Sequence, residues 1–373
     1  MPGITPGTQP RGDGLETRIR AAALTNFFEV AQTRGLNVQP LLRKAGLKRS
    51  LLADPDFRVP MAACVTLLED AAAASDCDNF ALRMAESRQL ADFGVISLLI
   101  AHQPNLRAAL ATLIRYRHLV NECVAMLLED AGSSVIIRVE VVGEAPSRQA
   151  GELAMGVVFR LCGALLGTRW QPLRVCFTHP APADESVHRR LFRCGLAFND
   201  EYNGIVCRAA DLDVPNPAAD PAMARHAQRV VDALPRPAAP TVAHEVRGAI
   251  ALLLPMGRAT GASVAQGLGM SLRTLQRALG DEGASFHDIL HAVRREQAPR
   301  HVENARVPLA QVAGLLGYGS PSTFTRWFSG EFGMAPSAWR SRAAARGPEP
   351  ADGPAYSDGT PGDETPGDEI PAD

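Results

Sequence analysis

The sequence of 373 residues has no long apolar run. Its best short stretch, VISLLIA at 95–101, is far below the roughly 18 uncharged residues that a membrane span needs. The amino terminus, MPGITPGTQPRGDGLETR, lacks the apolar core of a signal peptide. These absences predict a cytoplasmic protein with no membrane partner. The length suggests two or three domains of roughly 100–200 residues each.

Cysteines are few and follow no recognisable pattern. Seven are scattered over the chain, no two are spaced as CxxC, and none follows Cys207. An odd number of cysteines without a secretion signal favours reduced thiols over disulfides. We expect most of them to be buried as small apolar side chains.

Common catalytic motifs are missing too. The sequence contains no Walker loop, no GxSxG elbow and no dinucleotide fingerprint. His287 and His291 lie four residues apart, as a metal pair on a helix would, but no third ligand follows nearby. We therefore expect that the protein is not an enzyme and that it holds no metal and no cofactor.

Charge is distributed unevenly along the chain. Residues 241–346 contain 12 arginines, no lysine and 7 acidic residues, whereas residues 347–373 contain 8 acidic residues and no basic one. A basic block beside an acidic tail fits a polyanionic partner.

The hydrophobic pattern predicts an α+β domain followed by an all-α domain. Apolar residues recur at helical spacing in some segments of the first part and alternate or cluster as in strands in others. The predicted helices are 17–33, 60–75, 78–88, 104–122 and 147–167, and the predicted strands are two within 124–142, 173–179 and 204–208. The predicted organisation is a disordered segment over 1–15, an α+β domain over 16–214, a proline-rich linker over 215–241 with a short helix between its two proline-rich stretches, a helical domain over 242–343 and an acidic disordered tail over 344–373.

One phrase occurs twice in the helical domain, as VAQGLGMSLRTLQRAL at 264–279 and as VAGLLGYGSPSTFTRWF at 312–328. In each copy a glycine can end a first short helix in the left-handed conformation, and a following serine can cap a second helix. The glycines are Gly269 and Gly317, and the serines are Ser271 and Ser320. Ser263 is the expected cap of the first short helix. The pattern predicts two helix-turn-helix units.

The second helix of each unit presents polar residues outward. Arginine can pair with guanine, glutamine with adenine, and threonine can meet a thymine methyl group, while a helix amino terminus favours phosphate. We expect DNA contacts from Arg273, Thr274, Gln276, Arg277, Ser320, Ser322, Thr323, Thr325 and Arg326. The alternative is a helical block that binds a protein partner. Salt separates the two, because binding through several arginines weakens steeply as salt rises.

Residues 245–342, including the closing segment GEFGMAPSAWR at 330–340, resemble the AraC/XylS-type DNA-binding domain. The resemblance implies two units on a linking helix that read two successive major-groove faces. Pro299 departs from the pattern, because it lies where the family continues the linking helix. A proline inside a helix costs about 3 kcal/mol or kinks it, which leaves the relative angle of the two units open.

The first 215 residues resemble the arabinose-binding-like ligand-binding domain of one AraC branch, through segments such as GLNVQPLLRKAGL at 35–47 and CGLAFNDEYNGIVCRAADLDVPNPAADP at 194–221. The resemblance implies effector sensing and dimerisation, but it does not identify the effector as a sugar or name its pocket. His102, His118 and His179 are expected to be ordinary core or surface residues.

Together the two resemblances imply a ligand-responsive, sequence-specific transcription regulator, which we expect to be an activator and a homodimer. Its implied partners are double-stranded DNA, a small-molecule effector and, for an activator, RNA polymerase. A repressor remains the alternative, because the sign of regulation depends on operator position. Some DNA-repair methyl acceptors carry an AraC-type domain, but they need a cysteine-rich metal site or an activated cysteine. The absence of a CxxC pair and of any cysteine after Cys207 argues against such an enzyme here.

Overall fold

The structure is a computed structural model that describes residues 17–143, 147–167, 170–234 and 241–346. Residues 1–15 and 347–373, which were expected to be disordered, lie outside the described residues. The expected tail over 344–373 begins too early, because residues 344–346 belong to the last helix, Pro336–Arg346.

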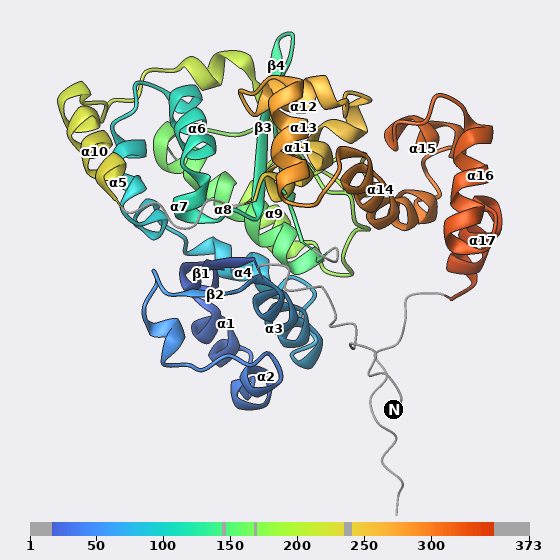
Figure 1. Ribbon diagram of the computed structural model, residues 1–373. Coiled ribbons are helices and arrows are strands. Elements are labelled where there is room, and N and C mark those ends of the chain that lie inside the picture. Colours follow the sequence, from blue (N-terminus) through green and yellow to red (C-terminus); the bar gives the residue numbers. More distant parts are fainter. Residues whose placement is uncertain (1–16, 144–146, 168–169, 235–240, 347–373) are drawn as a thin grey trace, which may run out of the picture.

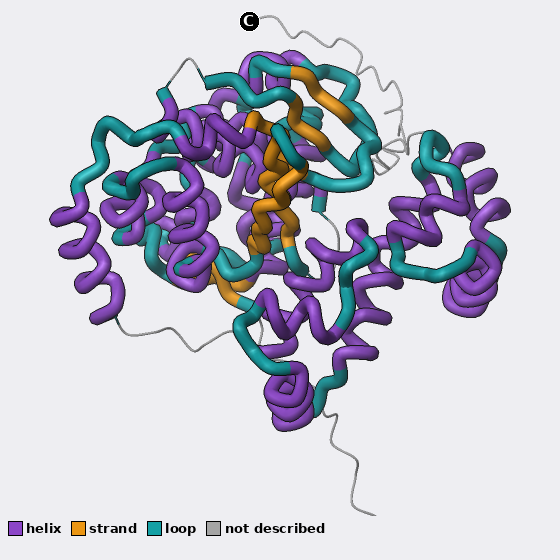
Figure 2. Tube along the Cα trace, turned by 90° about the horizontal axis from the view of Figure 1, so that it is seen from above, coloured by secondary structure: helices purple, strands orange, loops and turns teal. Residues whose placement is uncertain are grey.

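A five-stranded sheet forms the centre of the first part, in the order β3-β4-β7-β5-β6 (Figures 1 and 2). Only the pair β5 and β6 is parallel. The strands are β3 (Val124–Ala131), β4 (Ser134–Val141), β5 (Arg174–Cys176), β6 (Gly195–Ala197) and β7 (Gly204–Arg208). The predicted strands are therefore confirmed, whereas β6 was not foreseen.

Helices surround this sheet and share its core. The α-helices are α1 (Phe27–Thr33), α2 (Val38–Lys44), α3 (Met61–Ala74), α4 (Phe80–Glu86), α5 (Ile96–Ala101), α6 (Leu106–Arg115), α7 (Arg117–Val120), α8 (Arg148–Leu166), α9 (Ser186–Phe192) and α10 (Pro221–Ala233). Short 3-10 helices are η1 (Ala21–Leu24), η2 (Leu51–Ala53), η3 (Leu90–Phe93) and η4 (Ala209–Asp213). By length and composition α8 could cross a membrane, but 56% of that window is buried inside the protein, as in a core helix.

The helix predicted over 17–33 is wrong in its first half. Arg18–Arg20 forms β1, which pairs antiparallel with β2 (Arg58–Pro60). The main-chain N–H groups of Ala21 and Ala22 donate to the oxygens of Phe57 at 2.7 Å and Pro55 at 2.9 Å, so this stretch is no α-helix. Residues Ala21–Leu24 form the short 3-10 helix η1 instead. The α-helix begins only after Asn26, which adopts the left-handed conformation at φ 70°. Apolar spacing alone could not reveal a pairing partner so distant in sequence.

Helix α10 lies within the segment predicted to be a linker. Its Ala227 and Val231 are buried in the same core as the sheet domain. Before it, the Asn216 side chain donates to the main-chain oxygens of Ala101 at 2.8 Å and Gln103 at 2.9 Å. The chain as far as α10 is thus packed onto the first domain.

The second part is entirely helical and has a core of its own. Its elements are α11 (Val242–Leu253), η5 (Leu254–Met256), α12 (Gly261–Gly267), α13 (Leu272–Asp281), α14 (Phe286–Glu303), α15 (Leu309–Leu315), α16 (Pro321–Phe332) and α17 (Pro336–Arg346). The fold class, an α+β domain followed by an all-α domain, is therefore confirmed.

The two parts meet where α11 packs on β3 and β4 (Figure 1). A small apolar cluster at this contact contains Ala125, Val142 and Leu252. The contact also includes an ion pair between Arg117 and Glu245. Helix α11 therefore connects the sheet domain directly to the helices that follow it.

Candidate nucleic-acid interface and an apolar cavity

Helices α12 and α13 form the first helix-turn-helix unit. Gly269 ends the turn at φ 69°, and the Ser271 hydroxyl accepts the Thr274 main-chain N–H at 3.1 Å, as predicted. The predicted cap Ser263 is wrong. Thr260 lies outside the helix in an extended conformation, and its hydroxyl accepts the Ser263 N–H at 3.1 Å. The helix consequently begins at Gly261, and Ser263 lies inside it.

Helices α15 and α16 repeat the construction. Gly317 takes φ 66°, and the Ser320 hydroxyl accepts the Thr323 N–H at 3.2 Å, with Pro321 in the first helical position. A side chain on Gly317 would also meet Arg294, because a Cβ there would lie 3.2 Å from the guanidinium Nη2. The positive φ favours glycine at this position, and a larger residue would also require the Arg294 side chain to shift by a few tenths of an ångström.

The two turns share one hydrogen-bond pattern. In the first, the Met270 N–H donates to the Ala265 oxygen at 2.8 Å, and in the second the Tyr318 N–H donates to the Ala313 oxygen at the same distance. Each N–H thus crosses the turn to the small residue that the two sequence copies have in common. The repeated sequence therefore adopts the same backbone structure in both copies.

The apolar residues assigned to the interior point inward. Val264, Leu275 and Leu279 are buried in the first unit, with Leu268 and Met270 packed against them. In the second unit the buried residues are Val312, Leu316, Phe324 and Phe328, and Leu309 and Tyr318 pack on the same core. Burial of these faces leaves the opposite faces of α13 and α16 to solvent.

Eight of the nine residues expected to contact DNA are exposed. They are Arg273, Thr274, Gln276, Arg277, Ser322, Thr323, Thr325 and Arg326. Ser320 is half-buried, because its hydroxyl caps α16. Arg273, Arg277 and Arg326 form no ion pair with any residue that the structure describes. Their guanidinium groups are available to a phosphate or a base.

Helix α14 links the two units without a break at Pro299. The Arg294 side chain on α14 fixes the second turn, because its Nε donates to the Leu316 oxygen at 2.8 Å and its Nη2 to the Gly317 oxygen at 2.9 Å. The linking helix is thus continuous from Phe286 to Glu303, with Pro299 inside it.

Helix α17, the last helix of the domain, is hydrogen-bonded to the end of the linking helix α14 and to the residues that follow it. Arg340 donates from Nε to the Val302 oxygen at 2.6 Å and from Nη2 to the Val307 oxygen at 2.8 Å. The indole N–H of Trp339 donates to the Glu303 carboxylate at 2.8 Å. The segment that ends the AraC-like block thus holds the second unit on α14.

The histidines considered as ligands have structural contacts. Trp327 donates its indole N–H to Nε2 of His291 at 3.2 Å, and Nδ1 of His102 lies 2.9 Å from the Ala218 oxygen. His179 lies beside the buried Glu152, at 3.3 Å, and burial lowers its pKa to about 4. Among the described residues, no three His, Cys, Asp or Glu side chains gather to hold a metal ion.

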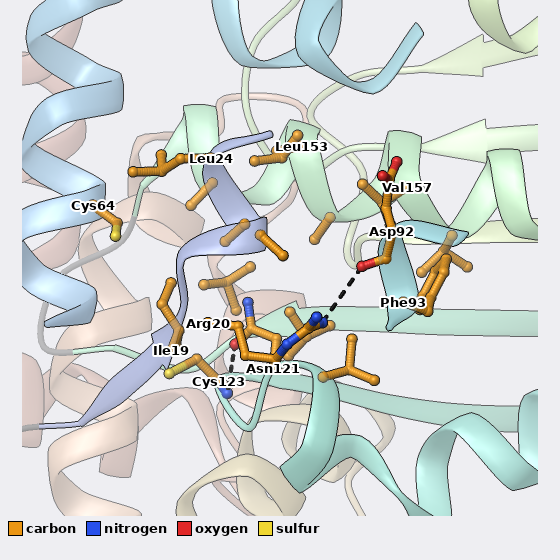
Figure 3. Close-up of a pocket in the computed structure, with 18 of the residues that line it drawn as sticks. Ile19, Arg20, Leu24, Cys64, Asp92, Phe93, Asn121, Cys123, Leu153 and Val157 are labelled. Atoms are coloured by element: carbon orange, nitrogen blue, oxygen red, sulfur yellow. Dashed lines mark hydrogen bonds between the residues drawn. The ribbon is translucent and has the colours of Figure 1, made fainter. Parts of the chain in front are cut away.

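A cavity of about 130 Å³ lies inside the first domain, between β1, η1, α3, α8 and the start of β3 (Figure 3). Most of its wall is apolar, and Ile19, Leu24, Leu153 and Val157 point into it in Figure 3. Burial raises the pKa of the Cys64 thiol in the wall to about 12, so this thiol remains protonated and apolar in character. An apolar wall with few polar groups is the usual lining of a small-molecule site. At about 130 Å³ the cavity encloses a short chain or a small ring, and a longer ligand would extend through its open side.

Three arginines reach this wall, namely Arg20, Arg88 and Arg117. Arg20 pairs with Asp56 at 2.6 Å, and Arg117 pairs with Glu245 of α11. None of the three was expected from the sequence, because nothing in their local sequence distinguishes them from surface arginines.

The chain thus combines a cavity-bearing α+β domain with two helix-turn-helix units. Residues 35–216 match the family described as "Arabinose-binding domain of AraC transcription regulator, N-term", and residues 264–342 match a helix-turn-helix domain family. The chain belongs to the AraC family of transcriptional regulators, with a ligand-binding domain followed by a DNA-binding domain.

Two relatives match nearly end to end. The HTH-type transcriptional regulator VirS of Mycobacterium tuberculosis is 28% identical, over 89% of this chain and 99% of that protein. The ornithine utilization regulator of Pseudomonas aeruginosa is 24% identical, over 84% of this chain and 94% of that protein. A shorter match, 32% identical over 24% of this chain and 26% of the relative, is to the transcriptional activator NphR of a Rhodococcus species.

Proposed function

We propose that the protein is a ligand-responsive activator of transcription that reads a specific DNA sequence with both helix-turn-helix units. The observation that carries this proposal is the repeated unit, with matched serine caps and left-handed glycines. In each copy this construction presents an exposed polar helix face, and its arginines, Arg273 and Arg277 in the first copy and Arg326 in the second, form no ion pair within the described chain.

The proposed DNA contacts are the nine residues of α13 and α16. Arg277 and Gln276 are suited to base edges, since arginine pairs with guanine and glutamine with adenine. Ser320 and Thr323 lie at the start of α16, where main-chain N–H groups and the helix dipole favour a phosphate. The helical domain over 242–343 is the proposed DNA-binding domain, and the α+β domain over 16–214 is the proposed effector-binding and dimerisation domain.

The proposal includes a homodimer, which would double the length of DNA contacted, and RNA polymerase as the partner of an activator. The name of the relative NphR, a transcriptional activator, supports activation of transcription, and repression is the alternative. The protein would act in the cytoplasm, without a membrane partner and without a catalytic role of its own.

The first experiment is fluorescence anisotropy of the full-length protein with the DNA upstream of its own gene and of the divergent neighbouring gene. A scrambled DNA of the same composition is the control. We expect tight binding that prefers the native DNA and falls linearly in log affinity with log salt concentration. Weak, salt-insensitive binding to both DNAs would favour a protein partner for the helical domain instead.

A further inference from the structure

We propose that the cavity of Figure 3 is the effector site and that its ligand is an apolar molecule with one anionic head, which Arg88 would bind. The proposal deepens the ligand response proposed above and rests on it. It concerns the chemistry of the ligand, which the family description does not determine.

Arg88 is a buried cation without an ion pair among the described residues, and the more distant charge of Asp92 offsets only part of the effect of its burial. Only 5% of its surface is exposed, and its two terminal nitrogens donate to the Ala22 and Ala23 oxygens at 2.6 and 2.7 Å. Its Nε is buried and has no hydrogen-bond partner. No described carboxylate lies within ion-pair distance of it. A buried charge without an ion pair is costly, so an anion beside Arg88 would be stabilised there.

Arg88 is the lining cation that is left for an anion, because Arg20 pairs with Asp56 and Arg117 pairs with Glu245. The polar lining consists of three arginines, the half-buried carboxylate of Asp92 and the side-chain amides of Gln89 and Asn121. Asp92 already accepts the Gln89 main-chain N–H at 2.9 Å. Burial lowers the pKa of Arg88 to about 10, so the group is still charged at neutral pH.

The apolar remainder of the wall disfavours a sugar. A sugar would bring several hydroxyl groups, and each one buried without a partner costs about 1–3 kcal/mol. Side chains such as Ile19, Leu24, Met61, Leu153 and Val157 offer none of these partners. The same surface favours a hydrocarbon chain or ring, since apolar burial contributes roughly 25 cal/mol per Å².

Arg117 provides a route from this cavity to the DNA-binding domain. It lines the cavity from α7 and pairs with Glu245 on α11. The amino end of α11 is in turn tied to the end of α13, because the Glu282 carboxylate accepts the N–H groups of Val242 and Ala243 at 2.7 and 2.8 Å. A ligand that shifts Arg117 would therefore act on the support of the first recognition helix.

The experiment is isothermal titration of the full-length protein, without DNA, with octanoate, octanol and octylamine. These probes share one tail and differ only in the head. We expect octanoate to bind roughly tenfold or more tightly than octanol, as for a hydrogen bond to a charged group, and octylamine to bind least. Equal binding of all three would overturn the anionic head, and binding of L-arabinose in preference to octanoate would overturn the ligand class.

Two variants locate the site. Arg88→Gln should abolish the preference for octanoate over octanol, and Val157→Phe should weaken both by filling the cavity. Melting curves establish that each variant folds. If Arg88→Gln fails to fold, the loss of both ligands in Val157→Phe still tests the location. Unchanged affinities in Val157→Phe would mean that the probes bind elsewhere.

The link to DNA has its own readout. Octanoate should change the affinity of the wild-type protein for its DNA, and this change should be lost in Glu245→Gln while octanoate still binds. If the wild-type protein binds its DNA but no probe, the ligand inference fails and the regulator proposal stands. If the probes bind as expected but no DNA is preferred, the regulator proposal fails instead.

Discussion

The guanidinium carbon of Arg294 lies 4.4 Å from the centre of the Tyr318 ring. The two residues come from the linking helix and from the turn of the second unit, so their contact fixes the orientation of that unit. Burial raises the pKa of the Tyr318 hydroxyl to about 12, so this group stays protonated.

Replacing Arg294 by alanine should lower the free energy of unfolding by about 1–3 kcal/mol, because two hydrogen bonds to turn oxygens and the contact with the ring are lost. The matched control is Arg295→Ala, since the neighbouring side chain is 66% exposed and lies 3.8 Å from Glu331. Urea denaturation measures both. A similar loss in the two variants would show that the Arg294 contacts contribute little.

Replacing Arg277 by alanine tests base reading by the first unit. We expect a loss of about 1–3 kcal/mol on the specific DNA and a much smaller loss on random DNA. Anisotropy with both DNAs measures the difference, and Arg229→Ala on the exposed side of α10 is the control. An equal loss on both DNAs would mean that Arg277 contacts only phosphate.

The cap of α12 allows a sharp test with two neighbouring hydroxyl groups. Thr260→Ala should destabilise the helical domain by about 0.5–2 kcal/mol, because the Ser263 N–H loses its acceptor. Ser263→Ala leaves that hydrogen bond intact and should have a smaller effect. Thermal unfolding of both variants gives the comparison, and the reverse order would restore Ser263 as the cap that the sequence suggested.

His301 makes stability depend on pH. It is buried, its Nε2 has no hydrogen-bond partner, and burial lowers its pKa to about 3. Because an unfolded histidine titrates near about 6.5, the unfolded chain binds more protons below that value. Stability is therefore full above about pH 6.5 and falls by about 1.4 kcal/mol per pH unit as the pH drops toward the native pKa.

The measurement for His301 is the urea midpoint at about pH 7.5 and about pH 5.5, compared between the wild type and His301→Leu. The variant should lose part of the pH dependence, by roughly 1.4 kcal/mol over this interval. His287→Leu is the control, since that side chain is 84% exposed and should leave the dependence unchanged. Identical behaviour of the wild type and His301→Leu would contradict the expected titration.

The helical domain could be predicted well because its signals are local. A serine cap and its N–H lie three residues apart, and a left-handed glycine needs no distant partner, so Ser271, Ser320, Gly269 and Gly317 have the predicted roles. The prediction of Ser263 as the cap was wrong because Thr260, three residues earlier, is also a residue type that caps helices well. The recognition-helix residues follow from periodicity, and their contacts with DNA stay a prediction.

The first domain could be predicted only in part. The hairpin of β3 and β4 carries its pairing partner beside it in sequence, whereas the three-residue strands β1 and β6 gain their pairing from remote segments. The cavity could not be predicted from the sequence for the same reason, because its wall combines residues that are far apart in the chain. Arg88 donates to oxygens 66 and 65 residues away, and no local pattern marks such a residue.

The unbroken linking helix also sets the distance between the two helix-turn-helix units. Its 18 residues span about 27 Å, which is shorter than the roughly 34–36 Å of one turn of B-form DNA. A rod of fixed length lets the two recognition helices tolerate little change in the phase of their target. Insertion of about five base pairs between the two contacted segments, half a turn, would rotate one of them to the far side of the duplex.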